Sequence, residues 1–122
     1  MKMSQEVKDA VAMNKPGLIA TASQSGKPNV SAKGSLRVID DEHVAFAIIK
    51  SPGTIANLRE NPQIAIICLD PATRSGCRIA GRSEIHSSGP LFEQLGAEYA
   101  AKRMAVQQVI KVSVEDAYTF KI

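Results

Sequence analysis

The segment from Gly17 to Ile49 reads GLIATASQSGKPNVSAKGSLRVIDDEHVAFAII, and its pattern decides the fold class. Short runs rich in Ile, Val and Ala alternate with the polar turn sequences QSGKP and DDE. Branched side chains suit a pleated sheet, whereas Gly, Pro, Asn and Asp favour the turns between strands. We therefore expect strands at 17–23, 29–40 and 43–49, joined by hairpins, with Gly34 interrupting the second strand.

The rest of the chain adds strands and three helices at the margins of a sheet. Helices are expected at 4–13, 52–61 and 90–104, and further strands at 63–69, 77–86, 107–114 and 118–122. Hairpins dominate, and parallel strands would need longer crossovers than these turns allow. The prediction is a mainly β chain, an antiparallel β-barrel of about seven strands, forming a single domain over residues 1–122.

Composition and charge narrow the class of protein. Val and Ile outnumber Leu by 21 to 6, and aromatic residues make up 4% with no Trp, so the core consists of small aliphatic side chains. The net charge is +3, but Lys and Arg are scattered and no basic run alternates with aromatics, so nucleic acid is not an expected partner. The longest apolar runs, Val44–Ile49 and Ile64–Leu69, have six residues, whereas a membrane helix needs about 20. Charged residues also occupy the N-terminal region, so we expect a cytoplasmic protein without an export signal or a membrane partner.

Common catalytic and metal-binding motifs are absent from the sequence. It contains no GxxxxGK[ST], GxGxxG, GxSxG or HExxH pattern, and His43 and His86 stand alone without ligand spacing. We therefore predict no catalytic side chain and no metal site. Cys68 and Cys77 are expected to be free thiols that face one another across the 70–76 hairpin.

Two local features suggest ligand binding, and each also has an ordinary structural explanation. In the first, Lys50-Ser51-Pro52-Gly53-Thr54 places hydroxyls and a lysine around a helix start, which suits a phosphate but also describes a common helix cap. In the second, the small residues 31–35 surround Gly34, which would let a flat ring lie against the backbone. A glycine at this place is equally consistent with a bulge that bends the sheet.

Taken in order, the segments resemble the FMN-binding split-barrel family related to pyridoxamine 5′-phosphate oxidase. The resemblance covers about two-thirds of the chain, from Gly17 to Leu95, and the run Thr54–Pro62 before a strand is its most typical part. In length and register the chain is similar to the small stand-alone FMN-binding proteins of that family. The matching segments are GLIATAS, QSGKPNVS, SLRVIDDEHVAFAI, SPGTIANLRENPQIAII, RIAGRSEI and GPLFEQL.

The resemblance implies a split barrel of six or seven strands and a homodimer with FMN bound non-covalently at the subunit interface. It implies phosphate contacts from Ser31, Lys50, Ser51 and Thr54. It implies ring contacts from the backbone of Ala32, Lys33, Gly34, Ser35, Ile48 and Ile49. It further implies that the partner subunit closes the site with its C-terminal part, which makes Phe120 and Ile122 candidates for ring contacts.

This chain departs from the family pattern in two places. Relatives often have Lys or Arg directly before the helix-opening Thr54, where this chain has Gly53, and Lys50 is positioned to compensate. The chain also ends soon after the barrel, whereas true pyridoxamine phosphate oxidases have a longer C-terminal region that contacts substrate. We therefore do not expect that particular activity.

The expected function is an FMN-binding redox protein, either an electron carrier or a small flavin-dependent oxidoreductase with an unidentified redox partner. One alternative keeps the fold and changes the ligand to haem or a deazaflavin, with His43 and His86 as the obvious axial ligands for haem. Another is a non-enzymatic module that binds an anionic partner through the net charge of +3.

Overall fold

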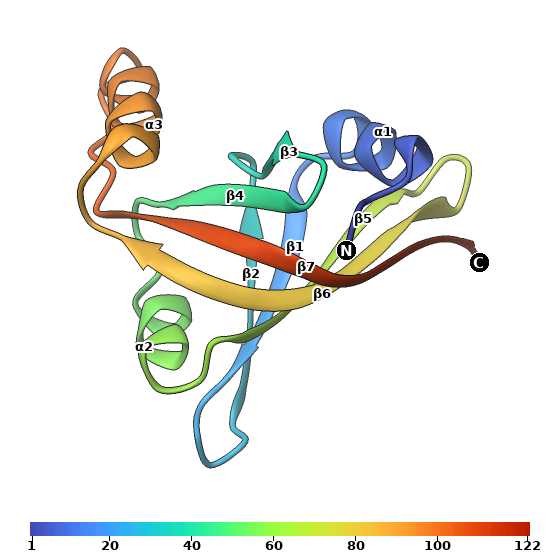
Figure 1. Cartoon of the computed structure of the whole chain (residues 1–122), viewed down its shortest axis with the longest axis horizontal. Helices are drawn as coiled ribbons and strands as arrows, with labels where there is room; N and C mark the ends of the chain where they lie inside the picture. Colours follow the sequence, from blue (N-terminus) through green and yellow to red (C-terminus); the bar gives the residue numbers. More distant parts are fainter.

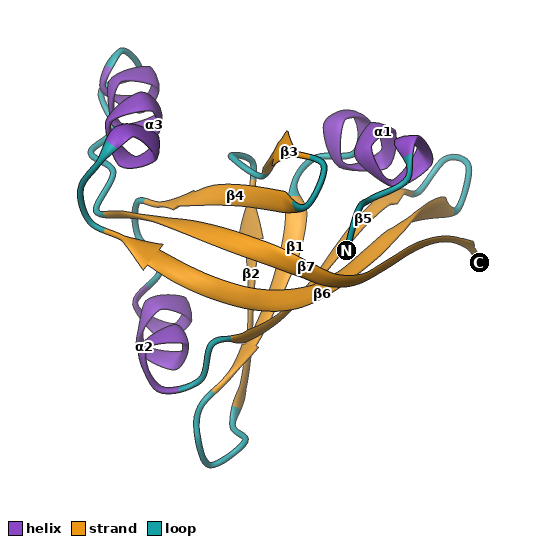
Figure 2. Ribbon diagram, viewed as in Figure 1, coloured by secondary structure: helices purple, strands orange, loops and turns teal.

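The computed structural model describes residues 1–122 as one curled antiparallel sheet with three short helices around it (Figures 1 and 2). The strand order is β2-β1-β5-β6-β7-β4-β3, and the mainly β split-barrel fold predicted from the sequence is confirmed. The helices are α1 (Gln5–Met13), α2 (Pro52–Glu60) and α3 (Pro90–Ala100). The strands are β1 (Gly17–Ala22), β2 (Pro28–Lys33), β3 (Arg37–Asp40), β4 (His43–Ile48), β5 (Gln63–Asp70), β6 (Ser75–His86) and β7 (Gln108–Lys121).

The inner face of the sheet carries the main hydrophobic core. Alternate residues of the strands point inward, and Phe46, Ile79 and Ile110 are completely buried there. Helix α1 closes one end, because its buried Val7 and Val11 belong to the same core cluster. Burial of many aliphatic side chains on one face thus replaces the large aromatic anchors that the sequence lacks.

The predicted strand at 29–40 is wrong as a single element. The structure divides it into β2 and β3, which lie at opposite edges of the sheet, and the chain crosses between them at residues 34–36. Gly34 is therefore part of a crossing segment and does not form a bulge within one strand. The hydrophobic pattern is similar on both sides of Gly34, so it could not show that the two halves pair with different strands.

The two strands predicted at 107–114 and 118–122 are also wrong as separate elements, because β7 runs continuously through both. Its pairing with β6 shifts register between Ala80 and Gly81, which lets the strand bend without ending. A Cβ at Gly81 would lie 2.2 Å from the backbone oxygen of Ser113, so glycine permits this close approach. Cys68 and Cys77 lie directly opposite one another on β5 and β6, and both are buried, free thiols.

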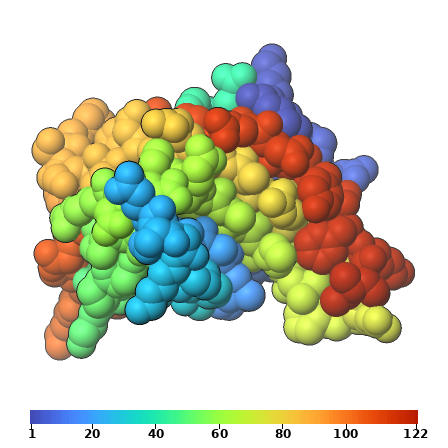
Figure 3. Space-filling view, turned by 90° about the horizontal axis from the view of Figure 1, so that it is seen from below, coloured from blue at the N-terminus to red at the C-terminus, as the bar shows by residue number.

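Helices α2 and α3 lie at one end of the sheet, and α1 and both termini lie at the other (Figure 1). Helix α2 packs beside the β1–β2 hairpin (Figure 3), where the side-chain amide of Asn57 donates to the Thr21 hydroxyl at 3.1 Å. Helix α3 ends at Ala100, four residues earlier than predicted. None of the three helices is long and apolar enough to cross a membrane.

Candidate functional site

A cluster of hydroxyl groups forms where β2 passes the first turn of α2. The Ser31 hydroxyl lies 2.9 Å from the Thr54 hydroxyl, and the Asn29 amide donates to the same Thr54 oxygen at 3.2 Å. Thr54 is only 1% exposed, so its side chain supports Ser31 from behind. A Cβ at Gly53 would lie 2.9 Å from the Asn29 side-chain oxygen, and a basic residue there would have to displace Asn29.

Lys33 brings a positive charge to this cluster from the end of β2. Its side chain is 8% exposed, and its ammonium donates to the Ser51 hydroxyl. Burial lowers the pKa of Lys33, and no carboxylate forms an ion pair with it. The Ser51 hydroxyl caps no backbone amide of α2 and instead accepts from Lys33. A buried ammonium without an acidic partner would be stabilised by an anionic ligand.

A cavity of about 260 Å³ opens next to Lys33. Its walls come from the end of β2, the crossing segment, β4 with the loop after it, and α3. The space beside Gly34 is open, and the Ser35 hydroxyl holds the crossing segment in place by accepting from the Ala47 amide at 2.9 Å. The lining residues are Ala32, Lys33, Gly34, Ser35, Ala47, Ile49, Lys50 and Tyr99.

The structure brings together most of the residues that the sequence assigned to a cofactor site. Six of them line the cavity, namely Ala32, Lys33, Gly34, Ser35, Ile49 and Lys50. Ser31, Ser51 and Thr54 lie in the adjoining hydroxyl cluster.

The other three assigned residues are not among those that line the cavity. Ile48 lies in the chain between Ala47 and Ile49, which line the cavity, while its own side chain is 2% exposed and belongs to the core. Phe120 and Ile122 lie near the C-terminus, at the opposite end of the sheet from α3 (Figure 1). A single protomer therefore does not bring Phe120 and Ile122 to the cavity.

The sequence prediction omits three side chains at the cavity, those of Lys33, Ala47 and Tyr99. Lys33 was assigned a backbone contact only, although it shares a strand face with Ser31 two residues earlier, a spacing that could have revealed its side chain. Ala47 and Tyr99 are not part of the predicted site, and no local signal shows that the Tyr99 ring reaches the cavity. The cavity brings together elements that are distant in sequence.

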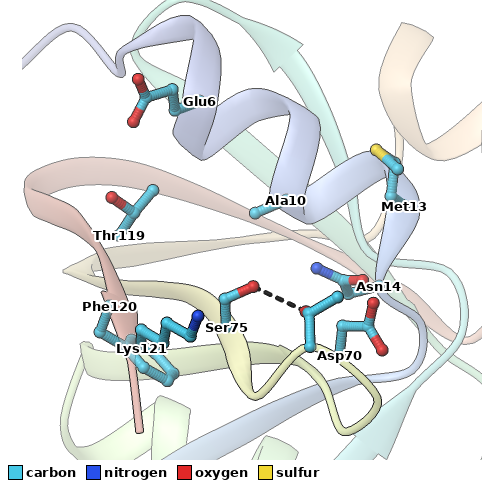
Figure 4. A pocket seen from close by; sticks show the side chains of 11 residues that line it. Glu6, Ala10, Met13, Asn14, Asp70, Ser75, Thr119, Phe120 and Lys121 are labelled. Carbon is cyan, nitrogen blue, oxygen red and sulfur yellow. Dashed lines mark hydrogen bonds between the residues drawn. The ribbon is translucent and has the colours of Figure 1, made fainter.

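The largest cavity, about 600 Å³, lies at the other end of the molecule (Figure 4). It is bounded by α1, the β5–β6 hairpin and the end of β7, and its lining is mainly polar, including Glu6, Asp70 and Lys121. Phe120 is the only residue of the sequence-assigned set that lines it. The chain contains no cluster of three or more His, Cys, Asp or Glu side chains able to hold a metal ion.

The two histidines lie outside the smaller cavity and have acidic neighbours. Nδ1 of His43 is 2.8 Å from the Asp40 carboxylate, and Nε2 of His86 is 2.6 Å from the Glu84 carboxylate. Neither histidine lines the cavity beside Lys33. An axial histidine for haem at that cavity is therefore not provided within one protomer.

The chain is similar to a known protein family and to solved structures along almost its whole length. The model of the family described as pyridoxamine 5′-phosphate oxidase matches residues 3–121. Comparison with curated protein sequences finds no match. Among solved structures, HupZ of Group A Streptococcus is 25% identical, with a TM-score of 0.89 over 98% of this chain and 94% of that chain.

Two further solved structures share the fold at lower identity. An FMN-binding protein from Syntrophomonas wolfei subsp. wolfei is 14% identical, with a TM-score of 0.84 over 97% of this chain and 86% of that chain. HutZ, the haem storage protein from Vibrio cholerae, is 19% identical, with a TM-score of 0.73 over 99% of this chain and 95% of that chain. The same fold thus occurs in one protein described as binding FMN and in another described as storing haem.

Proposed function

Because the chain belongs to the pyridoxamine 5′-phosphate oxidase family, we propose that it is an FMN-binding redox protein whose flavin occupies the cavity beside Lys33. The observation that carries this proposal is the buried Lys33 ammonium, which has hydroxyl neighbours and no carboxylate partner. A phosphate would supply the missing negative charge, and a ring attached to it would reach the adjoining cavity. The proposal therefore links the two features that the sequence suggested separately.

The phosphate end of the proposed site combines charge with hydrogen-bond donors. Lys33, Ser31 and Ser51 supply side-chain groups, and Lys50 adds a second ammonium at the cavity wall. The first turn of α2 adds free backbone amides and the positive end of the helix dipole. This donor set, with no acidic side chain in it, fits a phosphate monoester.

The ring end of the proposed site is built from small and apolar surfaces. Gly34 leaves the backbone open, while Ala47 and Ile49 offer an apolar wall on which a planar ring can lie. When bound, FMN supplies electron or hydride transfer, and the protein supplies binding, orientation and electrostatics. No carboxylate or imidazole lines the cavity, which favours an electron carrier or a simple flavin-dependent oxidoreductase over an enzyme that needs a general acid or base.

A homodimer is part of the proposal, because an apolar surface lies exposed on the outer face of the sheet. Leu18 on β1 and Ile67 on β5 are direct neighbours, exposed by 45% and 39%, and Val30 on β2 is 67% exposed. Together with Ala20 and Ala65, these side chains line a shallow and almost wholly apolar depression. We propose that a second copy covers this surface and brings its own Phe120 and Ile122 toward the flavin.

The proposal is tested by comparing FMN with riboflavin, which lacks the phosphate. Purified apoprotein is titrated with each ligand, alongside Lys33→Met and the control Lys27→Met, since Lys27 is exposed on the β1–β2 turn. Loss of one charge-assisted hydrogen bond costs about 1.5–3 kcal/mol, so we expect Lys33→Met to weaken FMN binding roughly 10- to 100-fold. Riboflavin affinity should stay the same in all three proteins.

Two results would contradict this proposal. The first is an unchanged FMN affinity in Lys33→Met, which would remove the cavity from the binding site. The second is a protein that binds no FMN but gives the visible spectrum of a haem protein when mixed with haemin. That outcome would support the haem alternative.

A further inference from the structure

Tyr99 of α3 lies on the wall of the cavity in which we place the flavin, together with residues 32–35 and Ile49. We infer that Tyr99 is a cofactor-contacting residue and that its phenol ring packs against the isoalloxazine ring of bound FMN. This assignment rests on the proposed function, and it adds a contact from an element outside β2, β4 and α2. It also gives α3 a role in the binding site.

The position of Tyr99 is fixed by how α3 docks on the sheet. Leu95, one turn earlier on the helix, is completely buried against Ala45, Ala47 and Val109 on the outer face of β4 and β7. Because Leu95 and Tyr99 are four residues apart, they lie on the same face of the helix. Tyr99 therefore points toward the sheet beside Ala47, where the cavity opens.

A two-pronged ion pair holds the same end of α3. The Arg37 guanidinium on β3 donates to both carboxylate oxygens of Glu98, at 2.6 and 2.9 Å. These hydrogen bonds lower the pKa of the Glu98 carboxyl, so the pair remains ionised at neutral pH. Since Glu98 directly precedes Tyr99, the pair restricts movement of the ring away from the cavity.

Tyr99 is mostly buried, and the part that stays accessible lines the cavity. The residue is 8% exposed, and the Lys102 ammonium lies 5.0 Å from the ring centroid. Offset stacking of aromatic rings adds about 0.5–1.5 kcal/mol to the burial of their area. A flavin ring lying on residues 32–35 would meet the Tyr99 ring across a cavity of about 260 Å³.

The composition of the chain makes this contact measurable. A phenol touching an isoalloxazine ring quenches its fluorescence by donating an electron to the excited ring, and the electron then returns. Phenylalanine does not do this. The chain has no Trp and two tyrosines, and the second, Tyr118, lies on β7 with its ring 5.9 Å from the Arg78 guanidinium and outside the cavity.

The experiment measures the fluorescence lifetime of FMN bound to the wild type, Tyr99→Phe and the matched control Tyr118→Phe. FMN affinity is measured for each protein, so that all are compared when saturated. We expect a strongly shortened lifetime in the wild type and in Tyr118→Phe, and a several-fold longer lifetime in Tyr99→Phe. The Phe variant keeps the packing of the ring, so its affinity should change by less than its lifetime.

The outcomes separate this inference from the proposed function. If FMN does not bind to the wild type, the proposed function fails before Tyr99 is tested. If FMN binds and its lifetime is the same in Tyr99→Phe as in the wild type, Tyr99 does not touch the ring and the inference is overturned. Recovery of the lifetime in Tyr118→Phe alone would also overturn it, because the quenching ring would then be on β7.

Discussion

At the scale of single residues, Lys33 has opposite effects on folding and on binding. Its ammonium is buried beside Ser51 without a carboxylate partner, so it lowers the stability of the apoprotein while it favours an anionic ligand. Residues that serve a ligand often have this cost, because the group that completes their charge arrives only with the ligand. The Lys33 ammonium therefore lacks a counter-charge only as long as no anionic ligand is bound.

We predict that Lys33→Met raises the stability of the apoprotein at neutral pH. Burial lowers the pKa of Lys33 below 10.5 in the folded chain, so the folded state loses the proton before the unfolded state does. The burial cost is therefore complete at pH values below the folded pKa and disappears as the pH rises toward 10.5.

Urea unfolding of both apoproteins between neutral pH and pH 10.5 measures this effect. The variant should be more stable at neutral pH, and the difference between the two proteins should shrink as the pH rises. A variant that is less stable than the wild type at neutral pH would show that the Lys33–Ser51 hydrogen bond outweighs the cost of burying the charge.

At the scale of secondary-structure elements, the hairpin of β5 and β6 depends on close approach of its two backbones. A Cβ at Gly76 would lie 1.9 Å from the backbone oxygen of Cys68, which neither strand can avoid by rotating a side chain. We predict that Gly76→Ala destabilises the protein by about 1–3 kcal/mol or more, because the strands must separate. Chemical denaturation monitored by circular dichroism measures the loss.

Gly96→Ala is the matched control for that substitution. Gly96 lies within α3, and beyond the adjoining residues and backbone of its own helix no atom is within 4 Å of the position of its Cβ. Alanine is a better helix former than glycine, so we expect this variant to gain about 0.5–1 kcal/mol. Equal losses in both variants would mean that the backbone contact at Gly76 does not matter.

The elements also differ in how well the sequence predicts them. Helices α1 and α2 begin within one residue of their predicted starts, with Ser4 and Ser51 at the N-cap positions, and β1, β4 and β5 match their apolar runs, because these signals are local. The segment 29–40 and the strand β7 were assigned wrongly, because their division or continuity depends on partner strands. Pairing across long sequence separations leaves little trace in a local pattern.

At the scale of the whole molecule, the exposed apolar surface of β1, β2 and β5 links two expected properties of the protein. If this surface is the dimer interface, disrupting it should also weaken FMN binding. Leu18→Asp places a charge beside Ile67 at the centre of this face. If a second copy covers it, the charge would be desolvated in the dimer, and we expect the variant to be monomeric and to bind FMN more weakly. Sedimentation velocity and FMN titration measure the two effects on the same sample.

Ala12→Asp is the control for this surface, because Ala12 is exposed on α1 and lines neither this depression nor the cavity beside Phe120. It should keep the oligomeric state and the FMN affinity of the wild type. A Leu18→Asp variant that remains dimeric would place the interface elsewhere. A monomeric variant with full FMN affinity would show that one protomer forms the complete site.

The sequence by itself determined the mainly β class, the positions of most strands and helices, and the small residues and hydroxyls around Gly34 and Ser51. Those features follow from local rules, because period, propensity and capping act between neighbours along the chain. Only the tertiary structure decided that β2 and β3 lie at opposite edges of the sheet, that Lys33 is buried beside Ser51, and that Tyr99 reaches the same cavity. These features arise only when distant segments pack together. The energy of each such contact depends on both segments, so neither segment predicts it alone.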